Sequence, residues 1–108
     1  MSALAYFMNL CSQMESKEPF FHKSTLMSAP SMEYKGRAFA MVYEDSIVLK
    51  IDGQILPETK TLGWQYFKPY GQPKYLQKWV AIPYYYHTDW FDLVQQALDD
   101  IKTSLGEA

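Results

Sequence analysis

Residues 37–51, RAFAMVYEDSIVLKI, decide the fold, because they read as two strands joined by a tight turn. Residues alternate between two faces in a strand, so one face of the first run is expected to carry Arg37, Phe39, Met41 and Tyr43, and the other Ala38, Ala40 and Val42. The polar pair Glu44-Asp45 separates this run from a second alternation that extends to Ile51. The pattern predicts an antiparallel hairpin at the centre of a sheet.

The elements outside this hairpin follow from periodicity and from turn residues. A helix over residues 3–16 is predicted by an apolar stripe with Ser2 as its cap; the stripe consists of Leu4, Phe7, Met8, Cys11 and Met14. A second helix, capped by Thr88 or Asp89, is predicted by the apolar residues Trp90, Val94, Ala97, Leu98, Ile101 and Leu105. Further strands are expected over 21–27, 65–68 and 75–82, with a short helix or turn over 56–63. Pro30 cannot donate to a ladder and should mark a bulge, an edge or a break.

These elements predict an α+β fold with the order α-β-β-β-(short α)-β-β-α. Strands that follow one another without long crossovers favour a mainly antiparallel, five-stranded sheet, with the N- and C-terminal helices packed on it. The 108 residues fit a single domain, and 48% apolar residues are enough for one core. One cysteine allows no intrachain disulfide, and the N-terminus has no basic leader, so we expect a cytoplasmic protein.

Charge is unevenly distributed, although the formal net charge is only -2. Between Thr59 and Thr88 every formally charged residue is a lysine, whereas the charged residues among the last twenty are all acidic except Lys102. Interleaved lysines and rings can hold phosphates and stack bases, so the nucleic-acid or anion candidates are Lys68, Lys74 and Lys78. The alternative is that these lysines are solvated or guard a sheet edge.

The aromatic residues suggest two other kinds of site. A protein partner, or a second copy of the chain, could bind at Tyr84, Tyr85, Tyr86 and His87, because three consecutive rings on an extended segment cannot all point inward. A small ligand could bind in a pocket formed by some of Tyr43, Trp64, Trp79 and Trp90. The alternative for both sets is ordinary packing in the core.

Residue types that carry catalysis do not form a recognisable motif here. Two histidines, His22 and His87, are too few for a metal site, and Cys11 lies on an apolar helical stripe. The acidic pairs Glu44-Asp45 and Asp99-Asp100 read as solvated charge. We therefore expect no catalytic residue, metal or cofactor, and a chain that is not an enzyme.

Several positions match those of a known family. They are Gly36-Arg37-Ala38-Phe39-Ala40 at the start of the hairpin, Leu49-Lys50, Gly63, Phe67 with Pro69, Trp79-Val80, Pro83, Trp90 and Ala97. On these residues the chain resembles the N-terminal domain of the bacterial TfoX/Sxy family, whose fold is related to that of the YjbR-like proteins. The family often has Met-Phe-Gly near its first strand, where this chain has Met27-Ser28-Ala29. The resemblance implies a YjbR-like α+β fold and a regulatory or protein-interaction role; the helical C-terminal domain of full-length competence regulators is not expected within these 108 residues.

Overall fold

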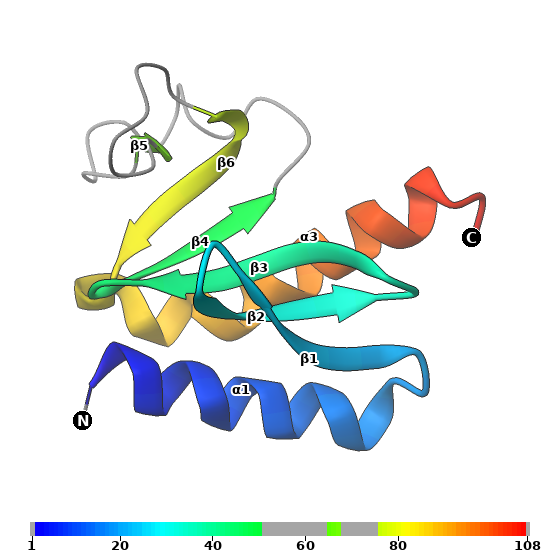
Figure 1. Cartoon of the computed structure of the whole chain (residues 1–108), viewed down its shortest axis with the longest axis horizontal. Helices are drawn as coiled ribbons and strands as arrows, with labels where there is room; N and C mark the ends of the chain where they lie inside the picture. The colour runs from blue at the N-terminus through cyan, green and yellow to red at the C-terminus, as the bar shows by residue number, and fades with distance from the viewer. Residues whose placement is uncertain (1, 51–64, 68–75, 108) are drawn as a thin grey trace.

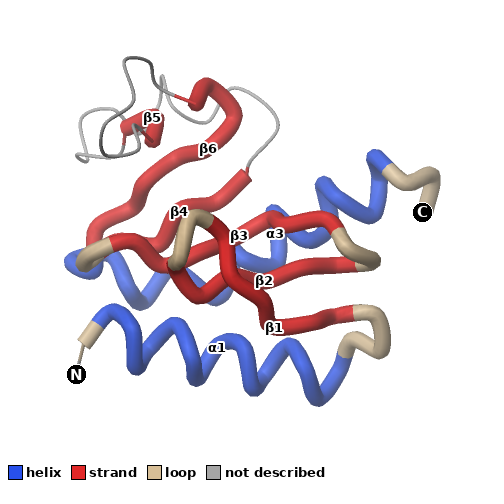
Figure 2. Tube along the Cα trace, in the orientation of Figure 1, coloured by secondary structure: helices blue, strands red, loops and turns tan. Residues whose placement is uncertain are grey.

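A computed structural model describes residues 2–50, 65–67 and 76–107 of the chain (Figures 1 and 2). Its helices are α1 (Ala3–Lys17), the 3₁₀ helix η2 (Tyr84–Asp89) and α3 (Trp90–Ser104). Its strands are β1 (Phe21–Leu26), β2 (Ala29–Tyr34), β3 (Arg37–Tyr43), β4 (Ser46–Lys50), β5 (Gln65–Phe67) and β6 (Leu76–Pro83). The strands form one antiparallel sheet in the order β1-β2-β3-β4-β6-β5. The predicted α+β class, with an antiparallel sheet and a helix at each end of the chain, is confirmed.

Helix α1 begins where the sequence predicts. The Ser2 hydroxyl oxygen accepts a hydrogen bond from the Ala5 amide at 3.1 Å, which satisfies one of the free amides of the first turn. The buried face differs from the expected stripe, because Leu4 and Met8 are exposed. The residues that α1 buries are Ala3, Phe7, Leu10, Cys11 and Met14. The stripe is therefore rotated toward Leu10, and Leu4 and Met8 lie on the flank of the helix.

The sheet contains one strand, β2, that the sequence pattern did not predict. Met27 and Ser28 form a two-residue turn after β1, with φ angles of 52° and 64°, and the chain returns along β1 from Ala29. Pro30 lies opposite Thr25 in this hairpin, and pairing with β3 begins only at Ser31. The amide that Pro30 lacks is therefore not needed by the β2–β3 ladder.

The central hairpin of β3 and β4 is confirmed, with Tyr43 paired to Ser46 across Glu44-Asp45. The predicted alternation of faces holds from Ala40 to Tyr43, but it is wrong for residues 37–39, which precede Ala40. Met32 pairs with Ala40 and the next residue of β2 pairs with Ala38, so Phe39 is the extra residue of a β-bulge. The bulge turns Phe39 to the face of Ala40 and Val42, while Met41 lies on the opposite face.

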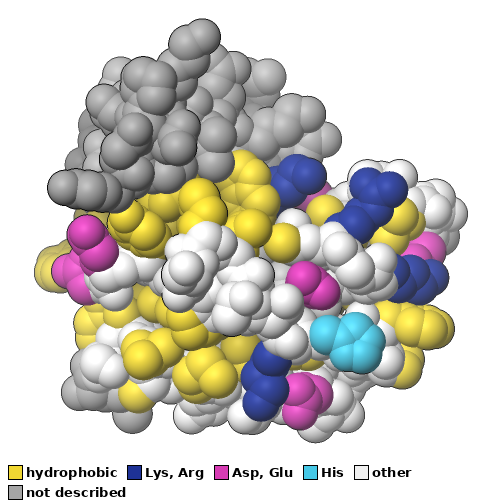
Figure 3. All heavy atoms as spheres, in the orientation of Figure 1, with side chains coloured by type: hydrophobic (Ala, Val, Ile, Leu, Met, Phe, Trp, Pro, Cys, Tyr) yellow, Lys and Arg dark blue, Asp and Glu magenta, His cyan; other side chains and the backbone are white. Residues whose placement is uncertain are grey.

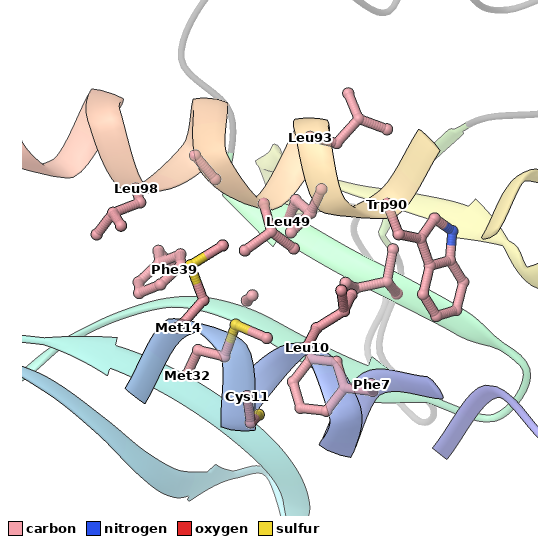
Figure 4. Packing of buried hydrophobic residues seen from close by; sticks show 14 of the residues in the cluster. Phe7, Leu10, Cys11, Met14, Met32, Phe39, Leu49, Trp90, Leu93 and Leu98 are labelled. Carbon is pink, nitrogen blue, oxygen red and sulfur yellow. The ribbon is translucent and has the colours of Figure 1, made fainter. Parts of the chain in front are cut away.

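Both long helices cover the same face of the sheet, and the main core lies between them and the strands (Figures 1 and 4). Figure 4 shows side chains from α1 (Phe7, Leu10, Met14), from α3 (Trp90, Leu98) and from the strands (Met32, Phe39, Leu49) in this core. A smaller cluster on the opposite face is centred on Met41, Val48 and Phe67. The predicted stripe of α3 is confirmed from Trp90 to Ile101, all of whose apolar positions are buried. The short helix or turn predicted over 56–63 lies outside the described residues.

Polar contacts tie the C-terminus to the far end of the sheet. The Lys35 ammonium donates to Glu107 at 2.8 Å, and the Tyr34 hydroxyl donates to the same carboxylate at 2.7 Å. The Tyr34 bond, followed by burial, raises the pKa of Tyr34 to about 12. Lys102 of α3 forms an ion pair with Glu18 at 2.9 Å, just after α1. Within the described residues, no helix is both long and apolar enough to span a membrane.

Candidate interaction surface

The segment Tyr84–Asp89 is a 3₁₀ helix, so the expectation that the tyrosine run is extended is wrong. Pro83 is extended and ends β6, and the chain then turns tightly along η2 toward α3. The backbone of this segment turns tightly and kinks at Tyr86 (φ -103°, ψ 25°), and the Tyr85 and Tyr86 rings meet edge-on with their centroids 4.9 Å apart. Tyr84 and Tyr86 are half-buried, whereas 83% of Tyr85 is exposed. The prediction that at least one ring is exposed is thus confirmed, although for a different geometric reason.

Tyr84 and His87 are held in a cluster of rings beneath η2. Their rings stack at a centroid distance of 4.6 Å with an interplanar angle of 13°. Tyr6 of α1 meets the His87 ring edge-on at 5.1 Å, and Trp90 meets Tyr6 at 5.8 Å and Tyr84 at 5.7 Å. Perpendicular and offset ring pairs of this kind each contribute about 0.5–1.5 kcal/mol beyond area burial. The cluster fixes η2 to both α1 and α3.

Backbone hydrogen bonds hold the same segment in place. The Tyr84 amide donates to the Asp45 carbonyl at 2.8 Å, which joins η2 to the turn between β3 and β4. His87 Nδ1 lies 3.0 Å from the Tyr84 carbonyl, and the Trp90 amide donates to the His87 carbonyl as α3 begins. Asp89 occupies the predicted cap position, but its side chain makes no capping hydrogen bond. A short helix held at both ends presents Tyr85 from a fixed backbone.

Trp90 packs against Tyr6 and Tyr84 in the ring cluster and is fully buried. Its indole N–H has no hydrogen-bond partner within the described part of the chain. A buried unpaired donor costs about 1–3 kcal/mol, so the aromatic packing around Trp90 has to offset that cost. Trp90 therefore contributes to this region through its packing against Tyr6 and Tyr84.

The carboxylates around Tyr85 are exposed. Glu44 and Asp45 lie in the turn that contacts η2, and Asp89 ends η2 itself. In Figure 3, acidic side chains lie beside hydrophobic ones at the end of the molecule where this turn is found. We call the set Glu44, Asp45, Tyr85, Tyr86 and Asp89 the η2 surface. It combines exposed aromatic area with negative charge.

The lysine candidates lie outside what the structure describes, and the pocket candidates that it describes lie on two faces of the sheet. Lys68, Lys74 and Trp64 lie outside the described residues, and Lys78 is within β6 with no description of its side chain. Trp90 belongs to the core under the helices, whereas Tyr43 and Trp79 pack on the opposite face of the sheet. The sheet therefore separates Trp90 from the two other described pocket residues.

The groups with potential reactivity are buried or isolated. Burial raises the pKa of the Cys11 thiol to about 11, because loss of solvation outweighs the opposing charge of Lys23. This confirms the prediction that Cys11 behaves as a buried hydrophobe. His22 is exposed on β1, and no group of three or more potential metal ligands occurs among the residues that the structure describes.

Tyr6 belongs to the ring cluster beside η2, and sequence reasoning did not single it out. Helical spacing places it next to the buried stripe of α1, without indicating which segment it meets. Its contacts with Tyr84, His87 and Trp90 arise only when α1 packs beside α3. No local signal in the sequence could have identified it.

The sequence matches no known protein-family model, and a search of curated proteins gives no match either.

Proposed function

We propose that this chain is a non-catalytic regulatory or protein-interaction module, and that its contact surface is the η2 surface. A partner protein or a second copy of the chain would bury Tyr85 there. The resemblance of Gly36-Arg37-Ala38-Phe39-Ala40 and Trp79-Val80 to the TfoX/Sxy N-terminal domain supports a regulatory role in a bacterial cytoplasm.

The observation that carries the proposal is the exposure of Tyr85. Tyr85 is 83% exposed, while Tyr84 and Tyr86 on either side of it are half-buried. Tyr84 is held by stacking on His87 and by its hydrogen bond to Asp45, and the Tyr86 ring meets the Tyr85 ring edge-on. Tyrosine is enriched among the residues that dominate binding energy at interfaces. Because η2 is already ordered, binding at Tyr85 would cost little conformational entropy.

The non-catalytic part of the proposal rests on the chemistry of the described side chains. A nucleophile needs a base within hydrogen-bond reach and an accessible position. Cys11 is fully buried with a raised pKa, and His87 Nδ1 is engaged by a backbone carbonyl. Neither is arranged for catalysis.

Photocrosslinking at position 85 tests the function. A photoreactive phenylalanine analogue would replace Tyr85 in the chain expressed in its native host, with Phe20 replaced in a matched control. Phe20 is also exposed, at 51%, but lies far along the sheet beside Tyr34. We expect one dominant adduct from position 85, absent from position 20, and lost when a second change, Tyr86→Ala, is added.

Mass spectrometry of the adduct distinguishes a partner protein from a second copy of the chain. The absence of any adduct from position 85 that position 20 does not also give would refute the proposed contact surface. Thermal unfolding of each variant confirms that loss of the adduct is not loss of the fold.

A further inference from the structure

We propose that the partner presents a positively charged segment, bearing lysine or arginine, to the η2 surface. The inference rests on the proposed function and adds the chemistry of the partner. Two independent features of the described residues support a positively charged partner: the ion pairs of the chain, and the cations that lie over its rings.

The ion pairs are all found away from the η2 surface. Within the described residues they join Lys23 to Glu15 at 3.9 Å, Lys35 to Glu107 at 2.8 Å and Lys102 to Glu18 at 2.9 Å. Lys102 and Glu107, near the C-terminal end, are thus each within 3 Å of an opposite charge. In contrast, Glu44, Asp45 and Asp89 are exposed and make no ion pair in the described part of the chain. Among the described residues, these three carboxylates near Tyr85 therefore have no cation paired with them.

The aromatic rings of the chain also differ in whether a cation lies over them. Phe20, which is half-exposed, has the Lys35 ammonium 4.7 Å above its ring, and Phe91 has that of Lys17 at 5.1 Å. These distances are those of favourable cation–π contacts. Tyr85 is the most exposed of the large apolar side chains, and among the described residues no cation lies over its ring. An incoming ammonium or guanidinium group would supply the contact that Phe20 obtains from Lys35.

The arrangement favours a protein segment over a small cation. The carboxylates come from two elements, the β3–β4 turn and η2, which the bond between Tyr84 and Asp45 holds together. A ring that is 83% exposed cannot enclose a single small cation on several sides. A chain carrying several positive groups can contact the ring and both carboxylate positions at once. Nucleic acid has the wrong sign of charge for this surface.

Two synthetic peptides of equal length test the inference, one alternating glycine with arginine and the other alternating glycine with glutamate. Titration into isotopically labelled protein at low salt is followed by the amide NMR signals. We expect the arginine peptide to shift residues 44–45 and 84–89, the glutamate peptide to shift none of them, and the effect to weaken with added salt.

Matched variants locate the binding. The combined change Glu44→Gln, Asp45→Asn and Asp89→Asn should weaken binding of the arginine peptide about tenfold, since each exposed charge pair contributes modestly. Tyr85→Ala should weaken it by a similar factor. The control Asp99→Asn removes an exposed carboxylate of α3 that already accepts from Gln95, and should change binding less than about twofold.

The inference and the proposed function fail in different ways. If the crosslinked adduct from position 85 forms equally well after the three carboxylates are neutralised, a charged partner is refuted and the contact surface stands. If the arginine peptide shifts signals all along α3, or binds the Tyr85→Ala protein unchanged, the inference is also wrong. If no adduct forms from position 85, the proposed function itself is refuted.

Discussion

Replacing Ser28 by glycine should stabilise this protein, because the turn between β1 and β2 contains no glycine where its backbone favours one. Met27 and Ser28 have φ angles of 52° and 64°. The left-handed region costs a residue with a Cβ about 1–2 kcal/mol, whereas glycine enters it freely and instead loses about 0.5–1 kcal/mol of unfolded-state entropy. The difference predicts that Ser28→Gly raises the free energy of unfolding by about 0.5–1 kcal/mol.

The neighbouring hairpin supplies the converse test. Gly36 joins β2 to β3 with a φ of 80°, and a Cβ added there would meet no atom within 4 Å. Gly36→Ala therefore has no steric cost, and its expected loss of about 1 kcal/mol comes from the backbone conformation alone. Ser24→Gly, placed within β1, is the matched control and should destabilise the protein, because glycine weakens a strand interior.

Urea unfolding monitored by tryptophan fluorescence measures all three variants. A change in midpoint at constant slope reports stability, and about 1 kcal/mol corresponds to a shift of about 0.3–1 M in the urea midpoint for a small domain. If Ser28→Gly leaves the midpoint unchanged or lowers it while Gly36→Ala costs the expected amount, then the left-handed turn at Met27-Ser28 is not strained. The reasoning would then be wrong for this hairpin.

Three other perturbations have defined outcomes. Hydrogen bonds from Lys35 and Tyr34 hold the pKa of Glu107 below its ordinary 4.5. The ionised carboxylate therefore stabilises the fold above that pH, and this contribution is lost as the pH falls. Thermal melts should show that Glu107→Gln destabilises the protein near neutral pH and progressively less in acid. Alkylation of Cys11, whose pKa is raised to about 11, should be at least about a hundredfold slower in the native protein than in urea. Phe39→Ala should cost about 3–5 kcal/mol in urea unfolding because Phe39 is fully buried, whereas Arg37→Ala should change stability by less than about 0.5 kcal/mol because Arg37 is exposed.

The parts of the fold that the sequence predicts are those with strong local signals. Helix α1 has a capping serine, and β3 and β4 alternate on either side of a polar pair. Strand β2 was not predicted, because Pro30, Ser31 and Glu33 interrupt its apolar pattern, although Ser31 is buried. A sheet position can bury such residues when its neighbouring strands provide the apolar contacts.

The bulge at Phe39 is invisible to an alternation argument. An uninterrupted count of two residues per repeat gives Phe39 and Met41 the same face, and only the register between β2 and β3 shows that one residue is extra. The candidate surface follows the same rule. That one tyrosine of the run is exposed follows from the sequence, but that it is Tyr85, and that Tyr6 supports it, depends on how α1 and η2 meet.

The strand pairings of the sheet differ in the loop-closure entropy that each one costs. Strands β1 to β4 are sequence neighbours joined by short turns, so each pairing closes only a small loop. Strand β6 instead pairs with a strand far away in the sequence, since Pro83 lies opposite Ser46 of β4. Each doubling of the length of such a connection costs about 0.6 kcal/mol more in chain entropy. Because η2 follows β6 directly, the backbone that leads into Tyr85 comes from the strand whose pairing spans the longest separation in sequence among the described strands. If β6 frays, only the contacts of η2 with Asp45, α1 and α3 keep Tyr85 in place.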